Sequence, residues 1–181
     1  EKTDIAADKV LNSHSTANVI YALWLSPDGV YKMSQEIKGM VQTSLNLGTA
    51  YLDTDKLVYK YLIRSNTAAG KKLLLERVTT FVKHLSGKVV TMSDYPAWEY
   101  KSDSQLRKIC VDSFTNVYGH EPEVTSIHAG LECGILAGKM PGVDMISFGP
   151  TLESVHTPDE CMNVASVERT WEYLREILKS L

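Results

Sequence analysis

Residues 126–134 (Ser-Ile-His-Ala-Gly-Leu-Glu-Cys-Gly) are the densest group of side chains that could bind a ligand or a metal. A β-rich run ends there at a histidine and a glycine, and Glu132 and Cys133 follow at once. Ligands bind at the carboxyl ends of parallel strands in open α/β sheets, and Gly130 would expose backbone amides to them. A strand end with a hydrogen-bonded histidine and a buried cysteine would have the same spacing, so both interpretations stay open.

The loop around His156 is a second candidate, and it follows the apolar run 146–148. Imidazole is the commonest metal ligand in proteins and titrates near neutral pH. The next residues, 157–160 (Thr-Pro-Asp-Glu), match a helix capping box, so their carboxylates have a structural explanation. Zinc needs several ligands, yet the sequence has no H-x-D, H-E-x-x-H or Glu-Glu motif. Most ligands of a metal at His156 would therefore lie outside this sequence.

Arg64 closes an apolar, β-rich run over 57–64, directly before a candidate helix cap at 65–66. A guanidinium at a strand end can hold a carboxylate through two parallel hydrogen bonds. A surface arginine paired with a local acid would give the same pattern. The absence of G-x-S-x-G, Walker and G-x-G-x-x-G motifs speaks against serine hydrolases and nucleotide-binding proteins. The three cysteines form no C-x-x-C pair and are typical of reduced thiols.

Alternating helices and strands must position these residues. Helical periodicity predicts helices at 4–25, 66–85, 103–118 and from about 164 onward. β-Branched and alternating runs predict a hairpin over 40–64 with its turn at 53–56, and separate strands at 89–95, 124–128 and 145–148. Gly87 should stop the second helix. The last helix is expected to turn five residues inward: Val164, Val167, Trp171, Leu174 and Leu178.

The segment 95–99 (Tyr-Pro-Ala-Trp-Glu) is the best boundary between two structural units. Before it, a hairpin, a helix and a strand indicate an α+β layer with an antiparallel sheet. After it, helices and strands alternate as in a parallel or mixed α/β sheet. The predicted class is therefore α/β, with one unit over 1–95 and another over 96–181.

Composition limits the class of protein. The 181 residues are 44% hydrophobic and 23% charged, which indicates a globular core and excludes disorder or a disulfide scaffold. A net charge of −3 gives no basic field for nucleic acid or an anionic membrane. The longest apolar run, 19–25, is far shorter than the about 20 residues of a bilayer span. We expect a soluble, cytoplasmic protein, and a chain that begins at Glu1 without methionine suggests part of something longer.

These segments together resemble one family, the aminoacyl-histidine dipeptidases, also called Xaa-His dipeptidases or cytosolic peptidase D. The family lies within the zinc-dependent aminopeptidase/carnosinase superfamily. The matching blocks occur in the family's order at 43–48, 62–65, 95–98, 128–134, 144–151 and 156–160. The resemblance implies a di-zinc catalytic domain interrupted by an α+β lid. Residues 1–95 would be the second part of the lid, and residues 96–181 the last part of the catalytic domain.

By the same resemblance, His156 would be the last zinc ligand and Arg64 the lid arginine that binds the carboxylate of the dipeptide. Gly130 would contact substrate through its backbone, with Glu132 as a weaker neighbour. No residue is assigned as catalytic, because the family's general base, its other metal ligands and the first half of its lid precede this region. Two zinc ions, or other divalent metals, would bind only in the whole protein.

The resemblance therefore implies the C-terminal portion of a cytoplasmic dipeptidase. Its partners would be the dipeptide substrate and the missing N-terminal part, with the lid as a candidate homodimer interface. We expect this chain alone to be inactive. A stand-alone, non-catalytic binding or dimerisation module on the same scaffold is the alternative, and a tri- or dipeptidase of different specificity is the nearest competitor among enzymes.

Overall fold

The computed structural model describes residues 9–53, 55–126 and 132–181. The chain divides into two compact units, Glu1–Asp94 and Tyr95–Leu181, called here the first and second units. The first unit contains helices α1 (Ser13–Leu25) and α2 (Ala68–His84) and strands β1 (Gly29–Met33), β2 (Val41–Asp53) and β3 (Lys56–Ser65). The second contains α3 (Gln105–Tyr118), α4 (Glu132–Lys139), α5 (Val164–Ser180) and the two-residue strands β4 (Leu152–Glu153) and β5 (Cys161–Met162).

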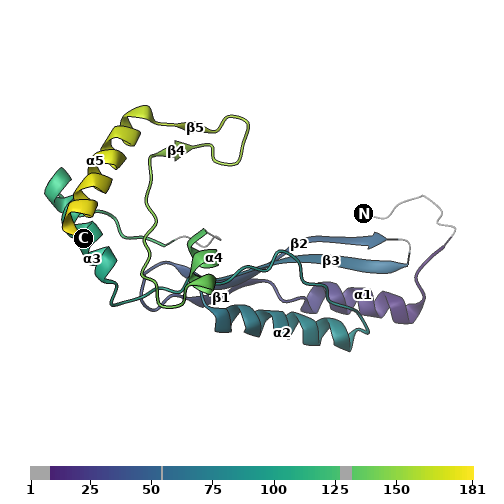
Figure 1. Cartoon of the computed structure of the whole chain (residues 1–181). Helices are drawn as coiled ribbons and strands as arrows, with labels where there is room; N and C mark the ends of the chain where they lie inside the picture. Colours follow the sequence, from purple (N-terminus) through teal and green to yellow (C-terminus); the bar gives the residue numbers. More distant parts are fainter. Residues whose placement is uncertain (1–8, 54, 127–131) are drawn as a thin grey trace. The chain divides into compact units, whose positions relative to one another are not determined.

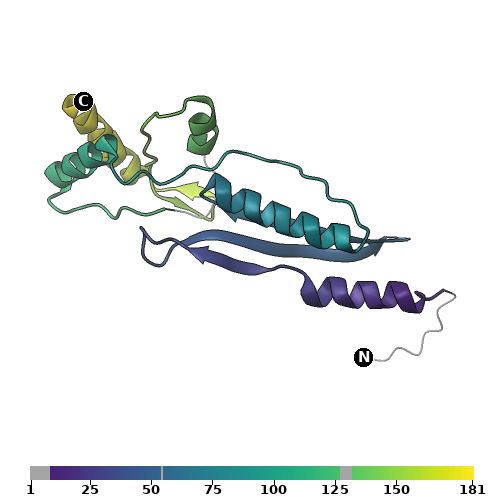
Figure 2. The same ribbon diagram turned by 90° about the horizontal axis from the view of Figure 1, so that it is seen from below.

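The sheet of the first unit is an antiparallel meander in the order β1-β2-β3, which confirms the predicted hairpin over 40–64. Strands β2 and β3 pair from Thr43↔Ser65 to Asp53↔Lys56, with one irregularity between Leu47 and Thr49. Figures 1 and 2 show α2 lying along one face of this long hairpin. Leu45, Leu74 and Val78 form the buried core between helix and sheet.

Helix α2 forms close to where it was predicted. The side chain of Thr67 caps its first turn by accepting a hydrogen bond from the Gly70 amide at 3.2 Å. At its other end, the Gly87 amide donates to Val82 O at 2.9 Å, but Ser86 takes the positive φ of 59°. Gly87 therefore lies just past the left-handed position. Helix α1 begins later than predicted, because Asn12 accepts from the Ser15 amide and starts the helix at Ser13.

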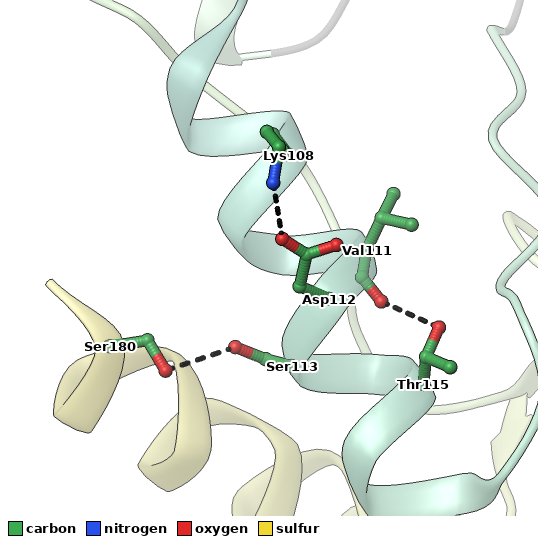
Figure 3. A network of polar contacts seen from close by, with 6 residues as sticks. All are labelled: Lys108, Val111, Asp112, Ser113, Thr115 and Ser180. Carbon is green, nitrogen blue, oxygen red and sulfur yellow. Dashed lines mark hydrogen bonds and ion pairs between the residues drawn. The ribbon is translucent and has the colours of Figure 1, made fainter.

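Helices α3 and α5 form the core of the second unit, where Cys110, Tyr173 and Ile177 are buried together. The Tyr173 hydroxyl donates to the Cys110 carbonyl at 2.9 Å, the Phe114 ring meets Tyr173 edge-to-face, and the Phe148 ring packs tilted against it. Figure 3 shows a second link, in which the Ser113 hydroxyl donates to Ser180 Oγ at 3.4 Å. These contacts join the two predicted helices.

The predicted inward stripe of α5 was wrong. Val164 and Trp171 are 80% and 59% exposed, whereas Ser166, Tyr173 and Ile177 are buried. The side of α5 that carries the predicted apolar residues is therefore rotated away from the side that is buried. The Tyr173 hydrogen bond and its ring contacts select the side that faces α3, so apolar periodicity alone pointed to the wrong face.

The α/β class is confirmed, with antiparallel strands in both sheets. However, the predicted separate strands at 89–95 and 145–148 do not form, nor does 124–126, and 127–128 lie outside the described residues. A strand is defined by hydrogen bonds to a neighbour, and these β-rich runs meet none within the described ranges. The glycine-containing stretch after residue 131, for which the sequence predicts no element, forms helix α4.

Candidate functional site

Arg64 is the penultimate residue of β3, where it lies opposite Ser44 in the ladder. Tyr61, Ile63 and Ser65 alternate with it and are more buried, because they face α2 and the core. Arg64 is exposed on the other face, in a row with Ser44 and Asn46 across the two strands. An exposed guanidinium at a strand end can donate two parallel hydrogen bonds to a carboxylate.

A cluster of hydroxyl side chains, called here the hydroxyl cluster, lies on the core side of the same strand end and consists of Thr43, Ser65 and Thr67. Thr43 Oγ1 lies 2.9 Å from Ser65 Oγ, which lies 3.3 Å from Thr67 Oγ1. The Thr67 amide donates to Ser65 Oγ at 3.2 Å, and the Gly70 amide donates to Thr67 Oγ1 at the same distance. Thr43 is only 3% exposed and Ser65 and Thr67 are half-buried, so the Thr43 hydroxyl is satisfied within the cluster.

Two amide side chains extend the polar character of this strand end. Gln42 and Asn66 are joined by a hydrogen bond from the Asn66 amide to Gln42 O at 3.1 Å. Their side-chain oxygens are buried and accept no hydrogen bond within the described structure. The sequence predicted Arg64 and a helix cap at 65–66, but the cap of α2 is Thr67, and neither the buried amide oxygens nor the hydroxyl cluster was predicted. One feature of the sequence could have indicated the cluster: Thr43 is a small polar residue on the same face of β2 as the buried Leu45.

His156 lies in the loop between β4 and β5 in the second unit, where it is exposed. It has a φ of +67°, and Ser154 has a φ of +52°, a conformation that non-glycine residues seldom adopt. The His156 backbone amide donates to Glu160 Oε2 at 2.7 Å. The Thr157 hydroxyl donates to Ser154 O at 2.7 Å and accepts from the Asp159 amide at 3.2 Å. The loop is therefore fixed by its own side chains.

The capping-box prediction for 157–160 is wrong, because no helix begins at Thr157 and α5 starts only at Val164. The same side chains still bond backbone amides, as capping residues do, but they close a turn within the β4–β5 connection. Asn163 is the actual cap of α5, since its side chain accepts from the Ser166 amide at 3.0 Å. Tight turns and helix starts use the same residue types, so the sequence alone could not distinguish a turn from a helix cap at 157–160.

Glu132 is the first residue of α4 and is exposed, whereas Gly130 lies outside the described residues. A carboxylate in the first turn of a helix is stabilised by the helix dipole, which accounts for Glu132 without a ligand. Gly134 and Gly138 face Pro96: a Cβ on Gly134 would lie 2.8 Å from Pro96 O, and one on Gly138 2.6 Å from Pro96 Cγ. The two glycines therefore allow α4 to pack closely against Pro96.

The described residues do not make a complete metal site. No group of three or more histidine, cysteine, aspartate or glutamate side chains is close enough among them to hold an ion. His156 supplies one imidazole, and zinc takes three or four ligands. Arg64 and His156 also belong to different units. No helix of the described ranges is long and apolar enough to cross a membrane.

Comparisons with known proteins place these features. The model of peptidase family M20/M25/M40 matches residues 11–180. The chain is 33% identical over 178 residues to the cytosol non-specific dipeptidase of Escherichia coli strain K12, covering 98% of this chain and 37% of that protein. The crystal structure of aminoacylhistidine dipeptidase from Vibrio alginolyticus matches with a TM-score of 0.88 and 33% identity, over 98% of this chain and 36% of the other.

A more distant solved structure, aminopeptidase PepT from Bacillus cereus ATCC 10987, matches with a TM-score of 0.62 and 17% identity. It covers 92% of this chain and 45% of the other, and at that identity it shows a shared fold only. In each comparison the chain spans less than half the length of its relative.

Proposed function

Because the chain belongs to peptidase family M20/M25/M40, we propose that it is the C-terminal portion of a zinc-dependent, cytoplasmic dipeptidase that hydrolyses Xaa-His dipeptides. The observation that carries the proposal is the match to aminoacylhistidine dipeptidase, with 33% identity and a TM-score of 0.88 over 98% of the chain. The expected resemblance to a dipeptidase of this kind is confirmed. The substrate class is inferred from the names of these relatives.

Arg64 is proposed to bind the terminal carboxylate of the dipeptide. Its exposure at the end of β3, on the face away from the core, supports this role. A carboxylate can accept two parallel hydrogen bonds from one guanidinium, so Arg64 would fix both the position and the direction of the substrate's end. A dipeptide has its carboxylate one residue from the scissile bond, and a contact there therefore limits substrate length.

His156 is proposed to supply one zinc ligand, and the remaining ligands must come from residues outside the described ones. Zinc would polarise the peptide carbonyl in the assembled protein. The residues present do not fit a complete zinc site, so we expect the 181-residue chain by itself to show no dipeptide hydrolysis. Gly130 is proposed to contact the substrate through its backbone, with Glu132 as a weaker neighbour in the same unit.

The division at Asp94 and Tyr95 supports assigning residues 1–95 to the second part of a lid and 96–181 to the last part of a catalytic domain. The lid is the proposed homodimer interface. Exposed apolar residues on α1, namely Tyr21, Trp24 and Leu25, are compatible with a covered surface there.

Kinetics of the intact protein test the proposal. Arg64→Ala should raise KM for an Xaa-His dipeptide and lower kcat/KM while the zinc content stays constant, whereas Arg64→Lys keeps the charge but loses the planar fork. Loss of zinc in Arg64→Ala would mean that the residue is misplaced in this scheme. Hydrolysis by the isolated, zinc-loaded chain would refute the expected inactivity.

A non-catalytic binding or dimerisation module is the second candidate. The observation behind it is the apolar surface of α1, which carries no Asp, Glu, Lys or Arg and exposes 84% of Trp24; both candidates would use this surface. Sedimentation of the isolated chain separates the two candidates when combined with the kinetics. A stable dimer together with an inactive intact protein would favour the module.

A further inference from the structure

Arg64 lies close to the end of the β2–β3 ladder. The register ends at Thr43↔Ser65, one residue beyond Arg64. After the bond from the Asn66 amide to Gln42 O, the chain turns into α2. Strand ends open more readily than strand centres. A residue that must hold a carboxylate in a fixed geometry would need another restraint here.

The hydroxyl cluster provides that restraint. Its bonds join three elements at one point: Thr43 on β2, Ser65 on β3 and Thr67 at the cap of α2. Ser65 follows Arg64 directly, so the cluster holds the backbone at the base of the Arg64 side chain. Because the cluster faces the core and Arg64 is exposed on the other face, the backbone of this strand position is held from the core side.

Gly70 lets the cluster close. A Cβ at this position would lie 2.5 Å from Thr43 Oγ1, 2.6 Å from Ser65 Oγ and 2.8 Å from Thr67 Oγ1, so only glycine leaves room for all three hydroxyls. Leu74 and Val78 follow on the same face of α2 and are 0% and 4% exposed. The first turn of α2 is thereby seated against the sheet beside the strand end that carries Arg64.

We propose that Thr43, Ser65 and Thr67 are positioning residues that hold Arg64 ready for the carboxylate of a dipeptide. The inference rests on the proposed role of Arg64 and adds the group that acts through it. Arginine has a long side chain with several rotatable bonds, and two parallel hydrogen bonds demand close alignment. A fixed backbone at its base leaves only side-chain freedom to be lost on binding.

The test uses the intact protein and steady-state kinetics with an Xaa-His dipeptide. Thr43→Val removes one hydroxyl with little change of shape and should raise KM about three- to tenfold while kcat stays within about twofold. Thr43→Ser keeps the hydroxyl and should restore KM. In an Arg64→Ala background, Thr43→Val should raise KM no further, because its effect passes through Arg64. Ser65→Ala replaces Thr43→Val if that variant does not fold.

Val78→Ala is the matched control, because it weakens the same helix–sheet core without touching the hydroxyl cluster. It should lower the melting temperature but leave KM within about twofold. The inference is overturned if Thr43→Val leaves KM unchanged, raises KM equally without Arg64, or does no more to KM than Val78→Ala. If Arg64→Ala itself leaves KM unchanged, the proposed function fails as well. If Arg64→Ala raises KM and Thr43→Val does not, only the positioning role fails.

Discussion

Gly70→Ala should destabilise the first unit, although the same change at an ordinary helix position stabilises. Alanine is favoured over glycine within a helix by up to about 1 kcal/mol. At Gly70, however, the new methyl would lie 2.5, 2.6 and 2.8 Å from the three oxygens of the hydroxyl cluster. Two of these oxygens belong to sheet residues and the third caps the helix, so none is the free end of a long side chain.

The expected magnitude follows from these two opposing terms. Forcing an extra methyl into a packed region costs about 1–3 kcal/mol, and the propensity gain offsets up to about 1 kcal/mol of it. We therefore expect the free energy of unfolding to fall by about 1–2 kcal/mol and the melting temperature by about 4 °C. Urea and thermal unfolding of the chain, followed by circular dichroism, measure both quantities. Hydrogen exchange of the α2 amides assigns the loss to the first unit.

Ala69→Gly is the matched control, because Ala69 is exposed in the same turn and reports propensity without packing. It should cost about 0.5–1 kcal/mol. Thr43→Ala removes the nearest oxygen, so Gly70→Ala should be less harmful in that background. The reasoning is refuted if Gly70→Ala leaves the chain as stable as the unsubstituted one, or more stable.

Three further predictions concern the second unit. Burial most strongly opposes the ionisation of Asp144, but hydrogen bonds, the first from a backbone amide at the start of α3, outweigh it and lower its pKa. Asp144 therefore stabilises the folded protein above the usual aspartate pKa, and this contribution is lost as the pH falls through the folded-state pKa. The urea midpoints of wild type and Asp144→Asn should accordingly converge in acid. Tyr173→Phe loses the buried bond to the Cys110 carbonyl and should cost about 1 kcal/mol in urea unfolding. Glu160→Ala should speed exchange of the His156 amide about tenfold by nuclear magnetic resonance, and Glu160→Gln should do so less, because its amide oxygen still accepts.

Local patterns in the sequence predicted much of the fold. The hairpin β2–β3 followed from alternation around Thr43 and Leu45, and α2, α3 and α5 followed from helical periodicity. These elements satisfy their own backbone hydrogen bonds, either within a helix or between strands that are adjacent in sequence. Their existence therefore depends on residues that lie near one another along the chain.

The errors arose where a structure depends on distant partners. The runs 89–95 and 145–148 have strand composition but meet no pairing neighbour in the described structure. The buried face of α5 was set by Tyr173 and its contact with Cys110, which are far apart in sequence. Composition gives the propensity for a strand or for an apolar helix face, and tertiary contacts decide whether that strand forms or that face is buried.

The candidate site was predictable to the same extent. Arg64 could be found as a cation at the end of a strand, and His156 as an imidazole in a loop. The hydroxyl cluster could not, because Thr43 and Ser65 meet only through the register of β2 and β3. Glu160 was assigned to a helix cap because the hydrogen bonds of a cap and of a tight turn involve the same residue types.

Arg64 and His156 share one structural feature, although they belong to different units. Arg64 lies near the end of β3 and His156 in the β4–β5 loop, and the backbone at each is held by bonds between residues of its own unit: the hydroxyl cluster behind Arg64, and Glu160 and Thr157 around His156. Neither restraint needs a metal or a substrate. The backbone at each residue is therefore held by hydrogen bonds from within its own unit, and this part of the geometry depends only on residues that the unit itself supplies.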